Sequence, residues 1–459
     1  MRLWALSMGM LVAAASPAAA RDTLVHDQQE YTAAAKALAP GDRIVLANGE
    51  WRDFAVRFSG AGTQDKPITL TAETPGKVIL TGASSLRMAG NWLVVSNLVF
   101  KDGHGTGEDL IAFRYDTRRW AENSRLTGVV VDGYGAPTAA KTDHWVSLYG
   151  QNNRVDHSQF FGKAHGGAML VVVRASYGPS ENHHRIDHNY FGPRPPLGEN
   201  GGETIRIGTS QESQSDSFTV VEDNYFERCD GEVEIVSIKS GRNILRRNTV
   251  VESQGAFVMR HGHGNRIEDN VFFGNGVKRT GGIRVINKHQ VVRNNYIEGV
   301  TGEGPYSAIT LMNGVPNSPL NRYVQVEDAL IERNSVIDAN TVTLGNGADQ
   351  ELSLAPISTR FVGNLFVNQK RGDPFVAKSD IAGISFSGNV MSVTGPATLP
   401  IAMDRRAVTL ERAANGLLYP TDPVLAKVGA DRTLKPITRE ETGVSWYAKP
   451  AASPHPGSN

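Results

Sequence analysis

The stretch NILRRNTVVESQGAFVMRHGHGNRIEDNVFFG, residues 243–274, contains the repeat that decides the fold. An apolar pair, two polar residues, an Asn and a second apolar pair occur in NILRRNTVV (243–251) and return in NRIEDNVFFG (265–274). Similar units extend on both sides of this stretch. They are NWLVVSNLVFKDG (91–103), NRVDHSQFFG (153–162), HRIDHNYFG (184–192), TVVEDNYFE (219–227), QVVRNNYIEG (290–299), ALIERNSVID (329–338), RFVGNLFVN (360–368) and ISFSGNVMS (384–392).

The spacing of these units indicates a solenoid. Their Asn falls at positions 97, 189, 224, 248, 270, 294, 334, 364 and 389, and several steps are 22 to 24 residues. Repeats of that length, with three short strands each and no helix between them, predict an all-β, single-domain parallel β-helix. We expect the longer steps to be coils with loops inserted on one face. We assign the Asn column to architecture, because stacked Asn amides satisfy one another and Asn tolerates a left-handed turn.

The ends of the solenoid carry different patterns. Residues 27–39 (DQQEYTAAAKALA) predict a short helix, with Asp27 and Glu30 spaced as a capping box and Pro40-Gly41 stopping it. We expect this N-terminal helix to cap the first coil, followed by strands at 42–51, 66–73 and 77–82. The β-helix domain should span residues 21–415, and residues 416–459 should form a peripheral strap with a disordered tail.

Composition and the first residues suggest the compartment. Residues 1–20 (MRLWALSMGMLVAAASPAAA) have the basic start, short apolar run and small-residue end of a secretory signal peptide, so we expect a periplasmic or secreted protein. We also expect it to act as a monomer. No later segment approaches the roughly 20 apolar residues of a membrane span. Lys+Arg and Asp+Glu are equal at 47 each, which argues against nucleic acid or a membrane as partner. The single cysteine, Cys229, excludes an internal disulfide and is expected to be a small buried hydrophobe.

The candidate chemistry lies in CDGEVEIVSIKSGRNILRRNTVVESQGAFVMRHGH, residues 229–263. Glu232 and Glu234 are two residues apart, so on a strand they point to one face and can share a cation. Lys239 and Arg260 nearby would suit an acidic substrate. Strict alternation places Lys239 on the opposite face from the two acids, so the site requires a bend near Ser237-Ile238.

Neighbouring coils supply further candidates. Lys239 and Arg260 are 21 residues apart and Arg260 and Arg284 are 24 apart, so each pair could occupy equivalent places on adjacent coils. One coil earlier, GENGGETIRIG (198–208) carries Asn200 and Arg206. Asn200 with Glu232 and Glu234 would give an all-oxygen set for a hard cation, and Ca²⁺ is the expected one. Zinc is disfavoured at the histidines, because His183, His184 and His188 lack the helix that a zincin spacing needs. Of the pair His261 and His263, His261 fits a substrate contact better.

Several long strings resemble one family. ENGGETIRIGTS, NYFERCDGEVEIVSIKS, RHGHGN and FFGNGVKRTGGIRVI, with NGEW and ITLTAETPGKVILTG near the start, look like polysaccharide lyase family 6, the family of alginate lyases and chondroitinase B. The similarity runs over roughly residues 24–400. It implies a right-handed parallel β-helix that cleaves uronic-acid polysaccharides by β-elimination with Ca²⁺. The additional C-terminal β-helix domain of some larger members is not expected in this chain.

The resemblance also implies a role for each candidate residue. Lys239 would be the base and Arg260 the acid, while Asn200, Glu232 and Glu234 would bind calcium. Arg284 and His261 would contact substrate, and we add Arg206 on the preceding coil to this set. A lysine is a usable base only where its surroundings favour the neutral amine. Elimination also requires that the charge of the substrate carboxylate be neutralised, which calcium and arginine can do.

Other functions remain open. Alginate is the expected substrate and dermatan sulfate the alternative, for which sulfate-binding candidates are Arg114, Arg118, Arg119, Lys141, Arg174 and Arg322. A β-helix glycoside hydrolase would need carboxylates on both sides of the scissile bond, whereas the spacing of Glu232 and Glu234 puts them on one side. A non-catalytic polysaccharide-binding solenoid would have no need for the acid pair, Lys239 and Arg260 together.

Overall fold

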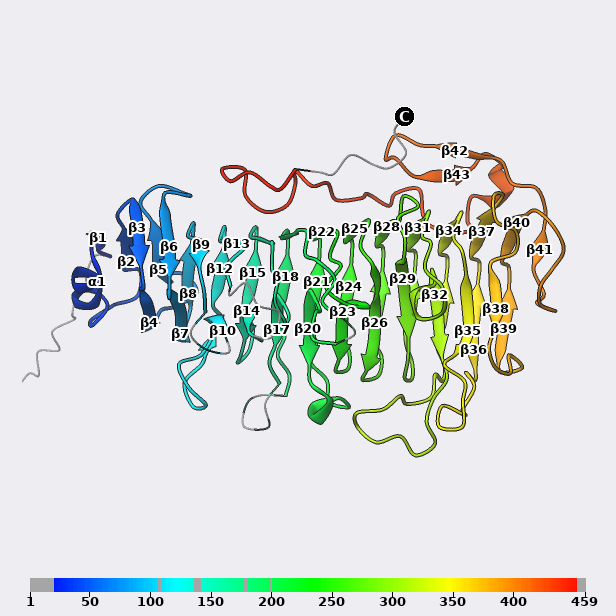
Figure 1. Cartoon of the computed structure of the whole chain (residues 1–459), viewed down its shortest axis with the longest axis horizontal. Helices are drawn as coiled ribbons and strands as arrows, with labels where there is room; N and C mark the ends of the chain where they lie inside the picture. Colours follow the sequence, from blue (N-terminus) through cyan, green and yellow to red (C-terminus); the bar gives the residue numbers. More distant parts are fainter. Residues whose placement is uncertain are drawn as a thin grey trace, which may run out of the picture.

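The computed structural model describes residues 20–105, 107, 109–135, 142–174, 176, 178, 180–198 and 200–451. The predicted signal peptide, apart from Ala20, lies outside these residues, as does the end of the predicted disordered tail from residue 452. In the described part of the chain, parallel strands stack into three long sheets that form the walls of one β-helix (Figure 1). The predicted fold class is confirmed.

Most coils contribute one strand to each sheet, in the order sheet A, sheet B, sheet C; one coil contributes both β10 and β11 to sheet C. Sheet A contains β1 (Asp22–Val25), β2 (Arg43–Leu46), β5 (Ile68–Ala72), β8 (Leu93–Ser96), β12 (Arg125–Thr127), β15 (Arg154–Asp156), β18 (Arg185–Asp187), β21 (Val220–Glu222), β24 (Ile244–Arg246), β27 (Arg266–Glu268), β30 (Val291–Arg293), β33 (Leu330–Glu332), β36 (Thr359–Val362) and β39 (Ile384–Ser387). Sheet B contains β3 (Gly49–Arg52), β6 (Val78–Gly82), β9 (Val99–Gly103), β13 (Val130–Asp132), β16 (Gln159–Phe161), β19 (Tyr190–Phe191), β22 (Tyr225–Glu227), β25 (Thr249–Val251), β28 (Val271–Phe273), β31 (Tyr296–Glu298), β34 (Ser335–Ile337), β37 (Leu365–Asn368), β40 (Val390–Val393) and β41 (Asp404–Arg405). Sheet C contains β4 (Ala55–Ala61), β7 (Ser85–Asn91), β10 (Asp109–Ala112), β11 (Ala121–Glu122), β14 (His144–Leu148), β17 (Leu170–Val172), β20 (Ile205–Gly208), β23 (Glu234–Lys239), β26 (Gly255–His261), β29 (Thr280–Val285), β32 (Ile309–Met312), β35 (Val342–Asn346) and β38 (Phe375–Ala377).

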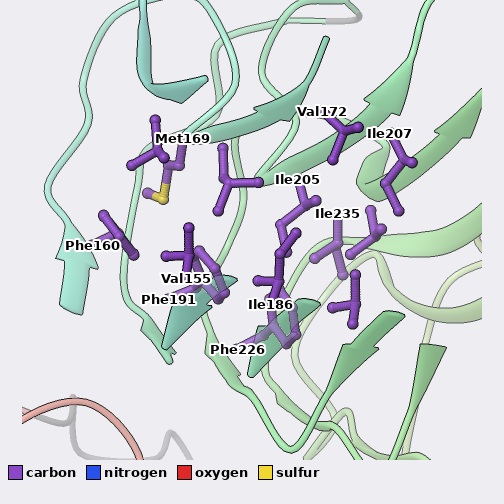
Figure 2. Close-up of a cluster of buried hydrophobic side chains, with 14 of the residues drawn as sticks. Val155, Phe160, Met169, Val172, Ile186, Phe191, Ile205, Ile207, Phe226 and Ile235 are labelled. Carbon is purple, nitrogen blue, oxygen red and sulfur yellow. The ribbon is translucent and has the colours of Figure 1, made fainter. Parts of the chain in front are cut away.

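The interior of the coils is a continuous apolar core, part of which is shown in Figure 2. Equivalent positions on successive coils are in register, so like side chains stack along the axis. Phe160, Phe191 and Phe226 form such a column, with ring centroids 5.5 and 5.0 Å apart. Full burial of each such ring contributes roughly 1.5–3 kcal/mol, which lets the solenoid hold its shape without a disulfide.

The turn between sheets A and B carries the predicted Asn ladder, with two corrections. Asn270 Nδ2 donates to the side-chain oxygen of Asn295, not Asn294, and the same pattern repeats along the axis. Asn97 also lies outside the ladder. Both Asn97 and Asn294 occupy the preceding turn position, with φ of 64° and 54°. The left-handed residue is therefore the one before the ladder Asn, and Arg, Asp, His and Gly also occupy that position.

The N-terminal helix is shorter than predicted. α1 (Gln28–Ala34) begins as expected, since the Asp27 side chain accepts a hydrogen bond from the Glu30 backbone N–H. It ends well before Pro40, and Ala35 is its C-cap residue. Its Tyr31 ring packs edge-on against Phe54, 5.0 Å between centroids, and so covers the first coils of the core. No helix in the described ranges is long and apolar enough to cross a membrane.

The C-terminal segment, residues 406–451, runs back along the outside of sheet B (Figure 1). It begins near β40 and includes the antiparallel pair β42 (Leu410–Arg412) and β43 (Leu418–Pro420) and the short helix η3 (Pro423–Leu425). Val444 packs among Val99, Val130 and Phe161, far back along the solenoid. This segment covers the outer face of sheet B and leaves the outer face of sheet C uncovered.

Long connections follow sheet C strands. Residues 209–219, with η1 (Ser210–Glu212), come after β20, and residues 313–329 come after β32. The coils of β23, β26 and β29, between them, have tight turns. The two long connections meet above these turns, where Ser213 Oγ donates to the Leu320 carbonyl at 2.9 Å. A wall therefore closes this edge of sheet C beside the tight turns.

Candidate active site

The predicted catalytic residues gather on the outer face of sheet C, on β20, β23, β26 and β29. The expected bend is present, but earlier than predicted: β23 has a register shift between Glu234 and Val236. This bulge adds one residue, so Glu234 faces outward together with Ser237 and Lys239, while Val236 and Ile238 enter the core. The bulge therefore resolves the conflict that strict alternation created between Glu234 and Lys239.

Glu234 is the centre of a charge cluster. Its Oε1 lies 3.8 Å from Arg260 Nε and 3.7 Å from Arg284 Nη2, and its Oε2 accepts a short hydrogen bond from the Ser237 hydroxyl. Burial favours the neutral acid, but Arg284, Arg260 and Lys239 outweigh it and lower the pKa of Glu234. Glu234 is therefore a carboxylate with two guanidinium groups at ion-pair distance, neither of which is hydrogen-bonded to it.

Beside this cluster lie two further carboxylates, Glu203 and Glu232, which have few hydrogen-bond or ion-pair partners. Glu203, just before β20, is buried, with Oε1 3.4 Å from Lys239 Nζ and no hydrogen-bond partner for Oε2 among the described residues. Glu232 accepts only a long hydrogen bond, 3.4 Å, from the Gly202 N–H. Burial, then repulsion from Glu203 and Glu234, raises the pKa of Glu232 to about 8. Glu203 lies in the stretch GENGGETIRIG, but the sequence predicted no role for it.

These oxygens suit a hard cation, because crowded carboxylates with an orphaned buried oxygen are what Ca²⁺ compensates. No group of three or more His, Cys, Asp or Glu side chains is arranged as a metal site within the described ranges. Asn200 is exposed on its loop, and Glu234 already has two arginines within 4 Å. The residues therefore fit a cation at Glu203 and Glu232 better than at Glu234.

Lys239 and Arg260 do lie on adjacent coils, but not at equivalent places. A second register shift, between Ile238 and Lys239, pairs Lys239 with His261 and leaves Arg260 as the extra residue. Arg284 likewise pairs with Val258, two residues before Arg260. The Arg260 guanidinium lies 4.1 Å from the centre of the Tyr323 ring, on the 313–329 connection. Nothing in the sequence around Tyr323 signalled this contact, because it depends on how a long connection folds back.

Of the predicted substrate contacts His261 and Arg206, the first is buried and the second lies on the outer face of sheet C. The His261 ring is fully buried, and neither nitrogen has a hydrogen-bond partner in the described part of the chain. Burial, then Arg260 and Lys239, lowers its pKa to about 3, so the imidazole is neutral. In this arrangement the buried His261 ring therefore offers no surface contact to a polymer. Arg206 pairs in register with Ser237 and lies 3.2 Å from His144 Nε2, so it belongs to the outward row.

Residues considered for other chemistry have structural roles. Cys229 is buried as expected, and burial raises the pKa of its thiol to about 12. The His184 Nδ1 accepts from the Asn153 N–H in a buried turn. Among the sulfate candidates, Arg174 is buried and bonds Asn182, and Arg322 pairs with Glu351. Lys141 lies outside the described residues.

Fold and site together define a parallel β-helix protein with a carboxylate, lysine and arginine cluster on one outer sheet face. The chain belongs to the chondroitinase B family, whose model matches residues 25–425. It is 50% identical to the PL6 family alginate lyase AlyGC, with a TM-score of 0.92, covering 94% of this chain and 59% of that chain. The chain thus spans well under two thirds of that relative.

Two further solved structures are similar. One is a mannuronic acid specific polysaccharide family 6 lyase from human gut microbiota, 35% identical with a TM-score of 0.75, covering 82% of this chain and 87% of that chain. The other is a PL6 family polysaccharide lyase from Pseudopedobacter saltans, 26% identical with a TM-score of 0.71, covering 93% and 100%. No curated protein matches the chain.

Proposed function

We propose that this protein is a polysaccharide lyase that cleaves alginate by β-elimination. The observation that carries the proposal is the outward row of sheet C, where Lys239, Arg260 and Arg284 surround the carboxylates of Glu203 and Glu234. Membership of the chondroitinase B family and the likeness to an alginate lyase support the same reaction. The expected product is an oligosaccharide with a 4,5-unsaturated uronate at its new non-reducing end.

The chain's own residues divide the reaction between them. Lys239 Nζ takes the proton from C5 of the uronate and becomes an ammonium, which requires the side chain to act unprotonated and out of its ion pair with Glu203. The electron pair of the broken C–H bond forms the C4–C5 double bond as the C4–O4 bond breaks. The departing O4 receives a proton from Arg260 or from a water that it orients. Arg284 and Arg206 supply positive charge for the substrate carboxylate as its charge grows.

A calcium ion is part of the proposal. Asn200, Glu232 and Glu234 are the predicted ligands; of these the geometry favours Glu232, together with Glu203, whose buried Oε2 lacks a partner in the described residues. When bound there, the cation would neutralise the uronate carboxylate and so make the C5 proton more acidic. Export of the protein through its predicted signal peptide, and action as a monomer on a polymer outside the cytoplasm, belong to the same proposal.

The test is to follow ultraviolet absorbance of the unsaturated product on alginate and on dermatan sulfate, with calcium and with EDTA. We expect absorbance to grow on alginate, to fall with EDTA, and to vanish in Lys239→Ala but not in the exposed-lysine control Lys66→Ala. Faster product formation on dermatan sulfate would reassign the substrate. Activity that survives EDTA would remove the cation. New reducing ends without absorbance would indicate hydrolysis, and no product from either polymer would favour a binding module.

A further inference from the structure

The turns that lead from sheet B to sheet C change charge along the axis of the solenoid. Glu203 and Glu232 lie on two successive turns of this kind, before β20 and β23. Beginning two coils further on, the equivalent turns carry Lys278 and Arg279 before β29 and Arg371 before β38. These coils follow one another in order in Figure 1. One corner of the molecule is therefore acidic at the candidate site and basic beyond it.

A cavity occupies the basic part of this corner. Its volume is about 690 Å³, and its lining includes Lys278, Arg279 and Arg371 against a single carboxylate, Glu303. A smaller cavity of about 180 Å³ lies beside Glu232, and Arg279 and Tyr306 line both. The Arg279 guanidinium lies 4.8 Å from the centre of the Tyr306 ring, at the junction. The basic cavity thus adjoins the acidic side of the candidate site, with Arg279 and Tyr306 between the two.

The three cations differ from most arginines of this chain in having no carboxylate of their own. On sheet A, for example, Arg125 pairs with Asp156, and Arg154 with Asp187. In contrast, neither Lys278 nor Arg279 nor Arg371 forms an ion pair with any described residue, and all three side chains are exposed. Positive charge held at a cavity without internal compensation is suited to an anionic ligand.

We propose that this basic cavity binds the carboxylates of uronate residues next to the one that reacts. The inference rests on the proposed lyase function. Arg279 is two coils from Glu232 and Arg371 is five, so at about 4.8 Å per coil they lie roughly 10 and 24 Å along the axis. A chain of acidic sugars leaving the candidate site along this corner would meet Arg279 and Lys278 first and Arg371 several residues later. The cavity therefore selects long acidic chains over short ones.

The test compares binding of uronate oligomers of increasing length to a double variant, Lys278→Gln with Arg371→Gln. The matched control is Lys36→Gln with Lys66→Gln, which removes the same charge from exposed lysines at the other end of the solenoid. All are made in Lys239→Ala, so that oligomers stay intact, and Kd is measured by calorimetry at low salt. Exposed charge contacts of this kind predict a Kd about fivefold higher for the longest oligomers, and no change for a disaccharide.

The possible outcomes distinguish failure of this inference from failure of the proposed lyase function. With the active parent, the same double substitution should raise KM for long oligomers and leave kcat unchanged. If the active parent eliminates alginate but the double variant matches the control at every oligomer length, the basic cavity has no part in binding. If the parent neither binds uronate oligomers nor yields unsaturated product, the proposed function fails and this inference fails with it.

Discussion

Glu234 is the only described carboxylate within 4 Å of Arg284 and of Arg260. Glu234→Gln keeps the shape of the side chain and removes its charge, which leaves Arg284, 4% exposed, without an ionic partner. We expect the free energy of unfolding to fall by about 3 kcal/mol, as for other broken buried pairs. Turnover of alginate should fall about 100-fold because two transition-state cations lose their position.

Urea denaturation and product absorbance measure the two effects of Glu234→Gln separately. Glu411→Gln serves as control, since Glu411 is exposed on β42 and forms no ion pair in the described residues. Equal stability of the Glu234 variant and the control would show that the cluster is not an ionic unit.

Arg194 positions the loop that carries the candidate cation ligands without reaching the site itself. Its buried guanidinium donates to the carbonyls of Gly202 and Glu203 at 2.9 and 3.0 Å, and to that of His165 at 3.0 Å. A lysine cannot make this fork of hydrogen bonds. Arg194→Lys should therefore weaken calcium binding about tenfold through its effect on Glu203. Calorimetric titration of calcium into chelator-treated protein tests this, with Arg293→Lys on sheet A as control. An unchanged calcium affinity would mean that Arg194 has a structural role only and does not position the cation ligands.

At the scale of elements, the sequence predicted the features that every coil repeats and missed those that occur in one strand only. Coil length, three strands per coil and an Asn ladder follow from a pattern that each coil repeats. The bulge at Glu234 and the shift that pairs Lys239 with His261 depend on interstrand hydrogen bonds, which no single strand's sequence displays. The same limit explains why Asn294 and not Asn295 is predicted as the ladder residue, since either Asn fits the repeat pattern and only the structure of the turn distinguishes them.

The N-terminal cap is joined to the first coil through Asp42, and this joint is sensitive to acid. The Asp42 carboxylate accepts from the Arg21 guanidinium at 2.6 Å and from the Ala39 N–H at 3.0 Å. Chiefly through Arg21, and against the opposing effect of burial, the pKa of Asp42 falls from 3.8 to about 2. Because the folded-state pKa is the lower one, this stabilisation is present above about pH 4 and is lost as the pH falls through about 2.

Asp42→Asn should therefore lower the Tm by about 2 °C at neutral pH, and the difference from the parent should shrink as the pH falls from about 4 toward 2. Thermal melts of both proteins across this range provide the measurement. Asp65→Asn, at an exposed side chain, is the control. Its Tm should differ only slightly from that of the parent, by an amount that does not depend on pH. A constant Tm difference for Asp42→Asn at every pH would mean that charge plays no part in the joint.

At the scale of the whole molecule, attraction of an acidic polymer must be local. Positive and negative side chains are equal in number, 47 each, so the net charge gives no long-range steering. The cations of the site and of the basic cavity therefore attract the polymer locally, over about a Debye length. Raising salt from about 0.1 to 1 M shortens the Debye length from about 10 to 3 Å and screens the exposed cations far more than the buried ones.

KM for long alginate should therefore rise several-fold over that range of salt while kcat changes little, because Arg284 and Glu234 are buried and Lys278 and Arg371 are exposed. Removal of the exposed pair by Lys278→Gln with Arg371→Gln should flatten the salt dependence of KM, and Lys36→Gln with Lys66→Gln should not. Initial rates of product formation at a series of salt concentrations supply both constants. A salt dependence of the same slope in all three proteins would place the screened cations elsewhere on sheet C.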